Sequence, residues 1–169
     1  GVQTCALPIL DSLDAIVFDA GPGMFTGLRV SAALAQGLAV ALDKPVIPVS
    51  SLEVLAESTY ESTGQKTVLT LLDARMNQIY AGGWTRTDIG WTALFEACLV
   101  NPDGLDQLPV LPTPFVVAGT GIAEYPAAKQ WLDMHGVRDS DVRYPSAEAL
   151  VRLGAMRLAA GQVTDPAEA

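Results

Sequence analysis

The chain has 169 residues, of which 50% are hydrophobic and 17% are charged, a composition typical of a globular protein large enough to bury a core. It carries 10 Lys and Arg against 19 Asp and Glu, a formal net charge of −9. A protein with this charge repels the phosphate backbone of a nucleic acid, so direct binding to that backbone is not expected. No apolar run is expected to approach the roughly 20 residues that a membrane span requires, and no signal-peptide pattern is recognisable. We therefore expect a cytoplasmic protein without membrane contact.

The first nine residues, GVQTCALPI, have no periodicity and read as the in-frame translation of a sequencing-adapter oligonucleotide. We interpret residues 1–9 as an adapter scar and exclude them from the fold; a genuine but disordered N-terminus is the alternative. Without this segment, Cys98 is the only cysteine of the chain. An intramolecular disulfide is then impossible, and a reducing compartment is natural.

The first half of the chain predicts a strand–helix–strand–helix order. A short apolar run over residues 13–20 predicts a buried strand that ends in the turn Gly21-Pro22-Gly23. A helix is predicted from about Thr26, a plausible N-cap, to the residues before Lys44-Pro45. A strand over residues 46–49 follows, and then a helix from Ser50 or Ser51 to about residue 60. Glu53 stands close to the capping-box position of this helix.

The second half predicts an antiparallel meander followed by a further strand and helix. Strands are expected over residues 67–73, 78–84 and 92–100, then an exposed Pro-rich connection over residues 101–114 and a strand over residues 115–118. A helix capped by Ser146 and closed by Gly161 ends the pattern. Together these elements predict an α/β fold with a mixed sheet, with residues 10–60 in one lobe and residues 61–165 in another.

The glycine-rich loop between the first strand and helix has two interpretations. Backbone N–H groups and a helix N-terminus could hold an anion there, the candidate residues being Gly21, Gly23, Thr26 and Gly27. However, the spacing is not G-x-G-x-x-G and no Gly-Lys-Ser/Thr follows, so both nucleotide-binding fingerprints fail. A tight turn that needs glycine for its backbone conformation is the favoured interpretation.

The predicted helix after this loop has one face of regularly spaced apolar residues and a second face that is nearly free of bulk. Ala33 and Gly37, with Ser31 beside them, would let another helix approach closely. Gly37 costs about 1 kcal/mol relative to alanine in a helix interior, which indicates that a contact matters there more than helix propensity. The contact could lie within the same chain or with a partner. The candidate partner-binding residues are Phe25, Arg29, Ala33, Gln36, Gly37 and Val40.

The segment Asp73-Ala74-Arg75, followed by Tyr80, places a carboxylate and a guanidinium at the end of a predicted strand, where α/β proteins often have sites. A local ion pair that fixes the turn is the simpler interpretation. His135 lies in a polar stretch and receives no chemical role. One His and one Cys far apart in sequence predict no metal site, and no G-x-S-x-G elbow presents a nucleophilic serine.

Three segments in this order resemble the TsaB family, also called YeaZ. They are AGPGMFTGLR at residues 20–29 with AQGLA at residues 35–39, then DARM at residues 73–76 with Tyr80, and AGTG at residues 118–121 with Tyr125-Pro126. The resemblance implies an actin/hexokinase-like (ASKHA) fold whose first strands and first helix are missing here. It also implies a dimerisation and activating subunit for TsaD, the paralogue that transfers the threonylcarbamoyl group to tRNA, with TsaE as the associated ATPase.

The resemblance further implies that the chain is not itself an enzyme and needs no cofactor. The catalytic paralogue has a metal-binding His-Met-Glu-Gly-His stretch after its Ile-Pro-Val strand, whereas here Ser50, Ser51 and Leu52 follow residues 47–49. In the family the first two helices of each partner form the subunit contact, and the second of them matches the small-residue helix. We expect a TsaD heterodimer, with a homodimer as a second assembly and tRNA contacted only indirectly.

Two alternatives remain. The first is a nucleotide-binding or acyl-transferring enzyme of the same superfamily, which would use the Gly21 to Gly27 loop and Asp73. The second is an independent protease, for which the sequence offers no paired nucleophile and base. A chain without its leading strands would also expose a sheet edge, so we expect it to be poorly stable or to self-associate when expressed alone.

Overall fold

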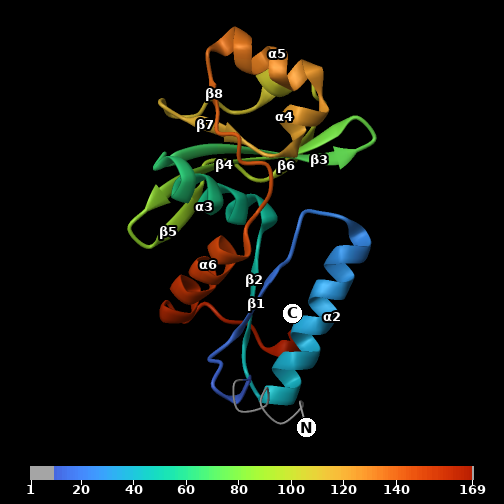
Figure 1. The fold of residues 1–169 in the computed structure, drawn as a ribbon, viewed down its shortest axis with the longest axis vertical. Coiled ribbons are helices and arrows are strands. Elements are labelled where there is room, and N and C mark those ends of the chain that lie inside the picture. The colour runs from blue at the N-terminus through green and yellow to red at the C-terminus, as the bar shows by residue number, and fades with distance from the viewer. Residues whose placement is uncertain (1–9, 169) are drawn as a thin grey trace.

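The computed structural model describes residues 10–168, so the predicted adapter scar at residues 1–9 lies outside the described residues. Two groups of elements are stacked along the long axis of the molecule (Figure 1). The first, here called the lower lobe, is built on a two-stranded sheet, and the second, the upper lobe, on a six-stranded sheet. The predicted division into residues 10–60 and 61–165 stays a prediction, and α6 (Ala147–Ala159), late in the chain, packs on the lower sheet.

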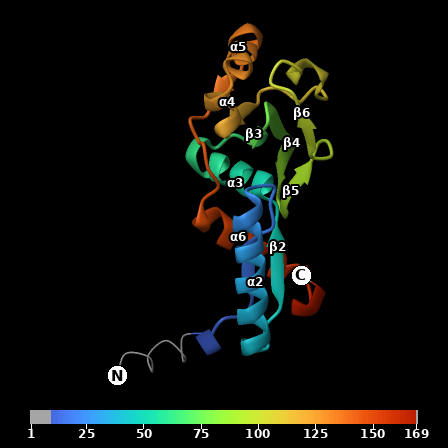
Figure 2. The same ribbon diagram turned by 90° about the vertical axis from the view of Figure 1, so that its right-hand side faces the viewer.

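The lower lobe is a parallel strand pair between two helices. β1 (Ile16–Asp19) pairs with β2 (Val46–Val49), and α2 (Phe25–Leu42) connects them. Figures 1 and 2 show α2 on one side of these strands and α6 on the other. Close packing on the α6 side requires a glycine, because a Cβ at Gly154 would lie 2.9 Å from the side chain of Val17. Apolar clusters on both sides bury the pair; their buried members are Phe18, Ala35, Ala39 and Val46 on the α2 side, and Ile47, Val49, Val54, Ala149 and Leu153 on the other.

The upper lobe is a mixed sheet. Its strand order is β5 (Gly90–Ala93), β4 (Gln78–Thr87), β3 (Thr67–Arg75), β7 (Val116–Ala118) and β8 (Arg138–Asp139), and β6 (Cys98–Val100) also pairs with β4. β3 is antiparallel to β4 and parallel to β7, as the mixed-sheet prediction requires. α4 (Thr120–Glu124) and α5 (Pro126–His135) lie on one side of the sheet, and α3 (Ser51–Thr63) lies on the other (Figure 1). Two short 3-10 turns, η2 (Leu105–Gln107) and η3 (Pro166–Glu168), complete the described chain.

α3 lies at the junction of the two lobes, and its first nine residues are all buried. Two carboxylates on this helix are paired. Glu53 lies 2.5 Å from an Arg157 nitrogen of α6, while Glu57 contacts the guanidinium of Arg86 and accepts a hydrogen bond of 2.6 Å from the indole of Trp91. Burial raises the pKa of Glu53, and the Arg157 guanidinium opposes that rise. These contacts tie α3 to α6 and to the β4–β5 hairpin.

Several sequence predictions are corrected by the structure. The N-cap of α2 is Met24 rather than Thr26, because the helix already begins at Phe25. The capping box at Ser50 does not form, since Ser50 makes no side-chain cap hydrogen bond and Glu53 pairs with Arg157 instead. By contrast, Ser146 caps α6 as predicted, accepting a hydrogen bond from the Ala149 N–H.

Other corrections concern the upper lobe. The predicted strand over residues 92–100 is split into β5 and β6, which pair with successive parts of β4. The Pro-rich connection is not simply exposed, because Leu105 and Leu111 on it are buried in the apolar core. Sequence periodicity also missed α4, α5 and β8.

The buried pair on α3 gives a stability prediction. Replacing Arg86 by Met should lower the free energy of unfolding by about 3 kcal/mol or more, because it leaves Glu57 with an uncompensated buried charge. The matched control is Arg152→Met, whose ion pair with Glu61 is largely exposed and should be worth less than about 1 kcal/mol. Urea denaturation at neutral pH measures both. Equal losses for the two variants would contradict this account of the junction.

Candidate partner-binding helix and interlobe cleft

α2 carries its small residues on two faces. On the inner face Ala35 and Ala39 are buried against Phe18 and Val46, so the predicted core face of this helix is confirmed. Alanine at these positions lets the helix axis lie close to the strands. Apart from η3, which packs on α2 near Val40, no element among residues 10–168 covers the outer face, and in Figure 2 this side of α2 is turned toward the viewer.

The outer face holds most of the predicted partner-binding residues. Phe25 is 67% exposed and Val40 is 70% exposed; Arg29, Ala33 and Gly37 are also exposed. The Arg29 guanidinium lies 3.9 Å from the centroid of the Phe25 ring. Only Gln36, which is partly buried, departs from the pattern. The outer face is therefore largely apolar, with one cation near its N-terminal end.

Three exposed apolar residues on or beside this face were missed by sequence reasoning. Met24, Val30 and Leu34 are 73%, 61% and 62% exposed. Their signal was present in the sequence, since Val30, Leu34 and Gly37 recur at helical spacing opposite Ala35 and Ala39. Isolated exposed apolar residues are ordinary, whereas a continuous apolar strip along one helix marks a contact surface.

Gly37 has no packing partner inside the described chain. A Cβ built at this position meets nothing within 4 Å, and the same holds for Gly27 near the start of α2. Packing within residues 10–168 therefore does not account for the glycine. Gly37 thus has low helix propensity and yet occupies an exposed position in the interior of α2.

The glycine loop is fastened by Asp19 at the end of β1. The carboxylate of Asp19 accepts hydrogen bonds from the Gly21 N–H at 2.8 Å and from the Ser51 hydroxyl at 2.5 Å. Gly21 has a φ of +98°, a conformation that favours glycine, and the Ser51 N–H donates to its carbonyl. A carboxylate already occupies the place that an anion would take at the Gly21 N–H. This geometry favours the tight-turn interpretation of the loop.

The remaining residues of the candidate anion site do not converge on one point. Gly23, Thr26 and Gly27 are exposed, and Thr26 lies inside the first turn of α2 rather than at its cap. Ser51 and Leu52, which stand where the paralogue's metal ligands are expected from the resemblance, are buried, with Ser51 bonded to Asp19. Within residues 10–168 no group of three His, Cys, Asp or Glu side chains is placed to hold a metal ion.

The Asp73 motif forms the predicted local ion pair. At the end of β3, Asp73 lies 3.0 Å from the Arg75 guanidinium and accepts hydrogen bonds from the Arg75 N–H at 2.8 Å and from the Tyr125 hydroxyl at 2.7 Å. Arg75, Met76 and Asn77 all have positive φ, so the β3–β4 turn is unusual in conformation and the carboxylate fastens it. Asp73 thus links this turn to the start of α5.

The pKa of the Asp73 carboxyl lies below its ordinary value of 3.8. Burial raises it, but the hydrogen bonds from Tyr125 and from the Arg75 N–H, together with the Arg75 guanidinium, lower it by more. Because the folded pKa is depressed, the stabilisation is fully present above pH 3.8 and is lost as the pH falls through the folded pKa.

A cleft of about 240 Å³ brings the two motifs together. Gly23 and Met24 from the glycine loop line it on one side, and Asp73, Arg75 and Tyr80 line it on the other. Ala74 and Thr120, which belong to the DARM and AGTG segments, also line it, whereas the sequence did not indicate Glu124 and Tyr144. An anion in this cleft would meet two carboxylates, Asp73 and Glu124, against a single guanidinium that Asp73 already neutralises. The electrostatics of the cleft therefore disfavour a phosphate group.

α2 has the length and composition of a membrane-spanning helix. Among the described residues it is the one helix that qualifies, with 18 residues, a mean hydropathy of 1.4 and 11% of its residues buried. The expectation that no apolar run approaches a span is therefore wrong on length and composition alone. A single such helix is weak evidence for a membrane, and its inner face packs on β1 and β2.

Comparison with known protein families places this fold. The family model described as TsaD, tRNA N6-adenosine threonylcarbamoyltransferase, matches residues 8–136. Two solved structures from Pseudomonas aeruginosa, YeaZ and a protein described as similar to the peptidase YeaZ, both superpose with a TM-score of 0.80. They are 29% and 30% identical in sequence and cover 95% of this chain, which in turn covers 74% and 73% of theirs. The class is thus that of the TsaD-like proteins with the actin/hexokinase-like fold.

Sequence relatives narrow the class. The tRNA threonylcarbamoyladenosine biosynthesis protein TsaB of Haemophilus influenzae is 35% identical over 153 residues, which are 85% of this chain and 62% of that protein. TsaB of Escherichia coli is 30% identical over 155 residues, which are 90% of this chain and 67% of that protein. The chain belongs to the TsaB (YeaZ) family. It spans about two thirds of the length of these relatives.

The geometry around Asp73 gives a pH prediction. Replacing Tyr125 by Phe should move the Asp73 pKa upward, because the hydrogen bond that stabilises the carboxylate is removed. The variant should also be less stable than the original at pH 7, and the difference should shrink below pH 3.8, where the carboxyl is protonated in the unfolded chain.

Carboxyl ¹³C NMR titration and urea unfolding at several pH values measure these two effects. The matched control is Tyr80→Phe, because Tyr80 lines the same cleft without a hydrogen bond to Asp73. An Asp73 pKa that moves equally in both variants, or in neither, would show that Tyr125 does not hold the carboxylate.

Proposed function

We propose that this chain is a non-catalytic dimerisation and activating subunit in the synthesis of tRNA N6-threonylcarbamoyladenosine, and that it binds TsaD through the outer face of α2. Its relatives in Haemophilus influenzae and Escherichia coli are named as biosynthesis proteins for this nucleoside. The observation that carries the proposal is the exposed apolar face of α2, which includes Gly37, a glycine that no packing contact within residues 10–168 explains.

The shape of the outer face supports a helical partner. Ala33 and Gly37 would allow a facing helix to approach to about 8 Å between axes, the short end of the usual range. Phe25, Leu34 and Val40 would then bury apolar area around this contact. Arg29, whose only described partner is the Phe25 ring, would face an acceptor on the partner. An apolar helix face of this kind fits a protein better than tRNA, which the net charge of −9 disfavours as a direct ligand.

The proposal includes the wider assembly. TsaE would join the complex with TsaD, tRNA would be contacted only indirectly, and a homodimer through the same face would compete with the heterodimer. We propose a cytoplasmic location, with the apolar face of α2 covered by protein rather than by lipid. No cofactor is proposed for this chain.

A bulky residue at Gly37 tests the proposal without disturbing the fold. Because a Cβ at Gly37 meets nothing within 4 Å among residues 10–168 and the position is exposed, Gly37→Trp should leave the thermal midpoint unchanged or slightly raised. It should nevertheless weaken binding to TsaD by at least about thirtyfold, since it holds the two helices apart. Pull-down and calorimetric titration with purified TsaD measure the loss, and Ala33→Trp should behave in the same way.

The matched control for this test is Ala155→Trp, a small exposed position on α6. This control should bind TsaD like the original protein. Unchanged binding by both outer-face variants would remove α2 from the interface, whereas loss of binding in all three would show a general effect of the added tryptophan.

The second candidate function is a nucleotide-binding or acyl-transferring enzyme that uses the glycine loop and Asp73. One observation favours it, namely the cleft that brings Gly23 together with Asp73 and Arg75. The carboxylate of Asp19 at the Gly21 N–H speaks against it. Calorimetric titration with Mg-ATP distinguishes the two functions: a scaffold gives little heat, and saturable binding that Asp73→Asn abolishes would favour the enzyme.

A further inference from the structure

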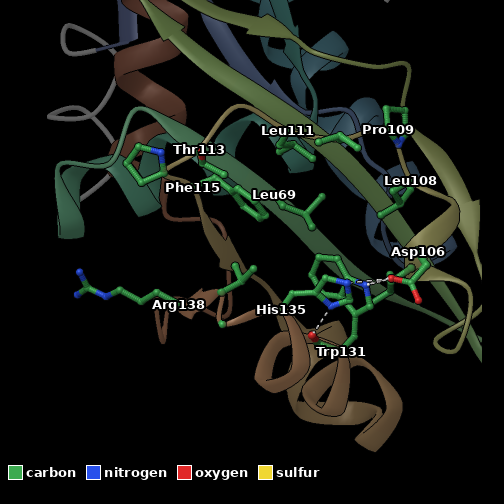
Figure 3. A pocket seen from close by; sticks show the side chains of 15 residues that line it. Leu69, Asp106, Leu108, Pro109, Leu111, Thr113, Phe115, Trp131, His135 and Arg138 are labelled. Atoms are coloured by element: carbon green, nitrogen blue, oxygen red, sulfur yellow. Dashed lines mark hydrogen bonds and ion pairs between the residues drawn. The ribbon is translucent and has the colours of Figure 1, made fainter.

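A cavity of about 620 Å³ lies in the upper lobe, between the connection over residues 101–114 and α5 (Figure 3). Its deepest lining residues are Leu69, Leu105 and Leu111, which are buried members of the apolar core. Its rim includes Val110, which is 99% exposed, so the cavity opens to solvent. A volume of several hundred Å³ with mainly apolar walls is typical of a small-molecule site.

One end of the cavity carries a fixed carboxylate. Asp106 accepts a hydrogen bond of 2.7 Å from the indole N–H of Trp131, and Nε2 of His135 lies 3.2 Å from the same oxygen. The rings of Trp131 and His135 are stacked with centroids 4.7 Å apart. These contacts join the connection over residues 101–114 to α5. Figure 3 shows the three side chains meeting at this end.

The second oxygen of Asp106 remains free to accept. Both described contacts use Oδ1, and the side chain is 67% exposed at the mouth of the cavity. The cation among the lining residues, Arg138, extends away from the Asp106 end in Figure 3 and has no ion pair within residues 10–168. His135 also places Nδ1 2.9 Å from the Trp131 carbonyl oxygen, so Oδ1 of Asp106 is shared between the indole and the imidazole. Oδ2 is therefore the acceptor of this carboxylate that a ligand N–H could use, beside Trp131.

We propose that this cavity binds a small organic cation, with an apolar or aromatic body inside it and an ammonium group on Asp106 Oδ2. A carboxylate supplies a charge-assisted hydrogen bond to such a group, and aromatic rings attract cations through their faces. Exposure of apolar walls of this size to water is unfavourable, and the apolar body of the ligand would remove them from water.

This proposal is independent of TsaD binding. None of the lining residues belongs to α2 or to the interlobe cleft, and Figure 1 shows α5 and β8 at the end of the molecule remote from the C-terminal end of α2. Failure of one proposal therefore leaves the other standing.

Three probes of similar size separate charge from apolar fit: 2-phenylethylamine, 2-phenylethanol and 3-phenylpropionate. NMR titration of the full chain should show shifts of the Trp131 indole N–H and the Val137 amide, with binding strongest for the ammonium and weakest for the carboxylate. Asp106→Asn should weaken the ammonium by about tenfold while leaving the alcohol unchanged, because only the charged hydrogen bond is lost.

Two further variants complete the test. Asp103→Asn, on the same connection but outside the cavity, should change nothing. Val110→Lys alters only the exposed rim, so it should fold normally and weaken the ammonium alone by repulsion. Absence of shifts at the cavity residues, tighter binding of the carboxylate, or an ammonium affinity that neither Asp106→Asn nor Val110→Lys reduces would overturn the proposal.

Discussion

Burial of α3 between the two lobes takes the carboxylates of Glu53 and Glu57 out of water, and there each needs a cationic or N–H partner. Arg157 from α6 and Arg86 from β4 supply those partners, with Trp91 as a further donor. Two distant parts of the chain, α6 and the β4–β5 hairpin, are thereby fixed around one helix. Such pairs add little net stability over apolar packing, but an arrangement that breaks one leaves a buried charge. They therefore specify how α6 and the upper sheet sit on α3.

This arrangement decides what α2 can do. With α6 on one side of the β1–β2 pair, α2 covers the other side and its outer face stays open. The small side chains of Ala35 and Ala39 let α2 pack close to the strands. On the outer side, Ala33 and Gly37 would let a partner pack equally close. The helix is consequently suited to lie between two packed surfaces, one in its own chain and one in a partner. The interlobe cleft, by contrast, has its charges satisfied locally by Asp73, Arg75 and Tyr125.

The strand–helix–strand unit of the lower lobe could be predicted from the sequence, because its periodicity and the Gly21-Pro22-Gly23 turn are local signals. The failed capping box at Ser50 could not, since the Arg157 that captures Glu53 lies 104 residues away. α5 could also have been predicted, because it has Pro126 at its start, Gly136 after its end and an amphipathic pattern with Ala128 and Leu132 on the buried side. The cleft joins Gly23 to Asp73 and Glu124 across the lobes, a contact that no short stretch of sequence encodes. Likewise, the exposure of Gly37 could be judged only once its neighbours were placed.

The central claim is that the outer face of α2 is covered by TsaD. Hydroxyl-radical footprinting of the chain alone and in complex with TsaD tests it at individual side chains, because exposed Met, Phe and Leu are readily oxidised. The account predicts strong protection of Met24, Phe25 and Leu34, with Ile89 and Met134 oxidised as before. Equal oxidation of the α2 residues in both states, with protection elsewhere, would contradict it.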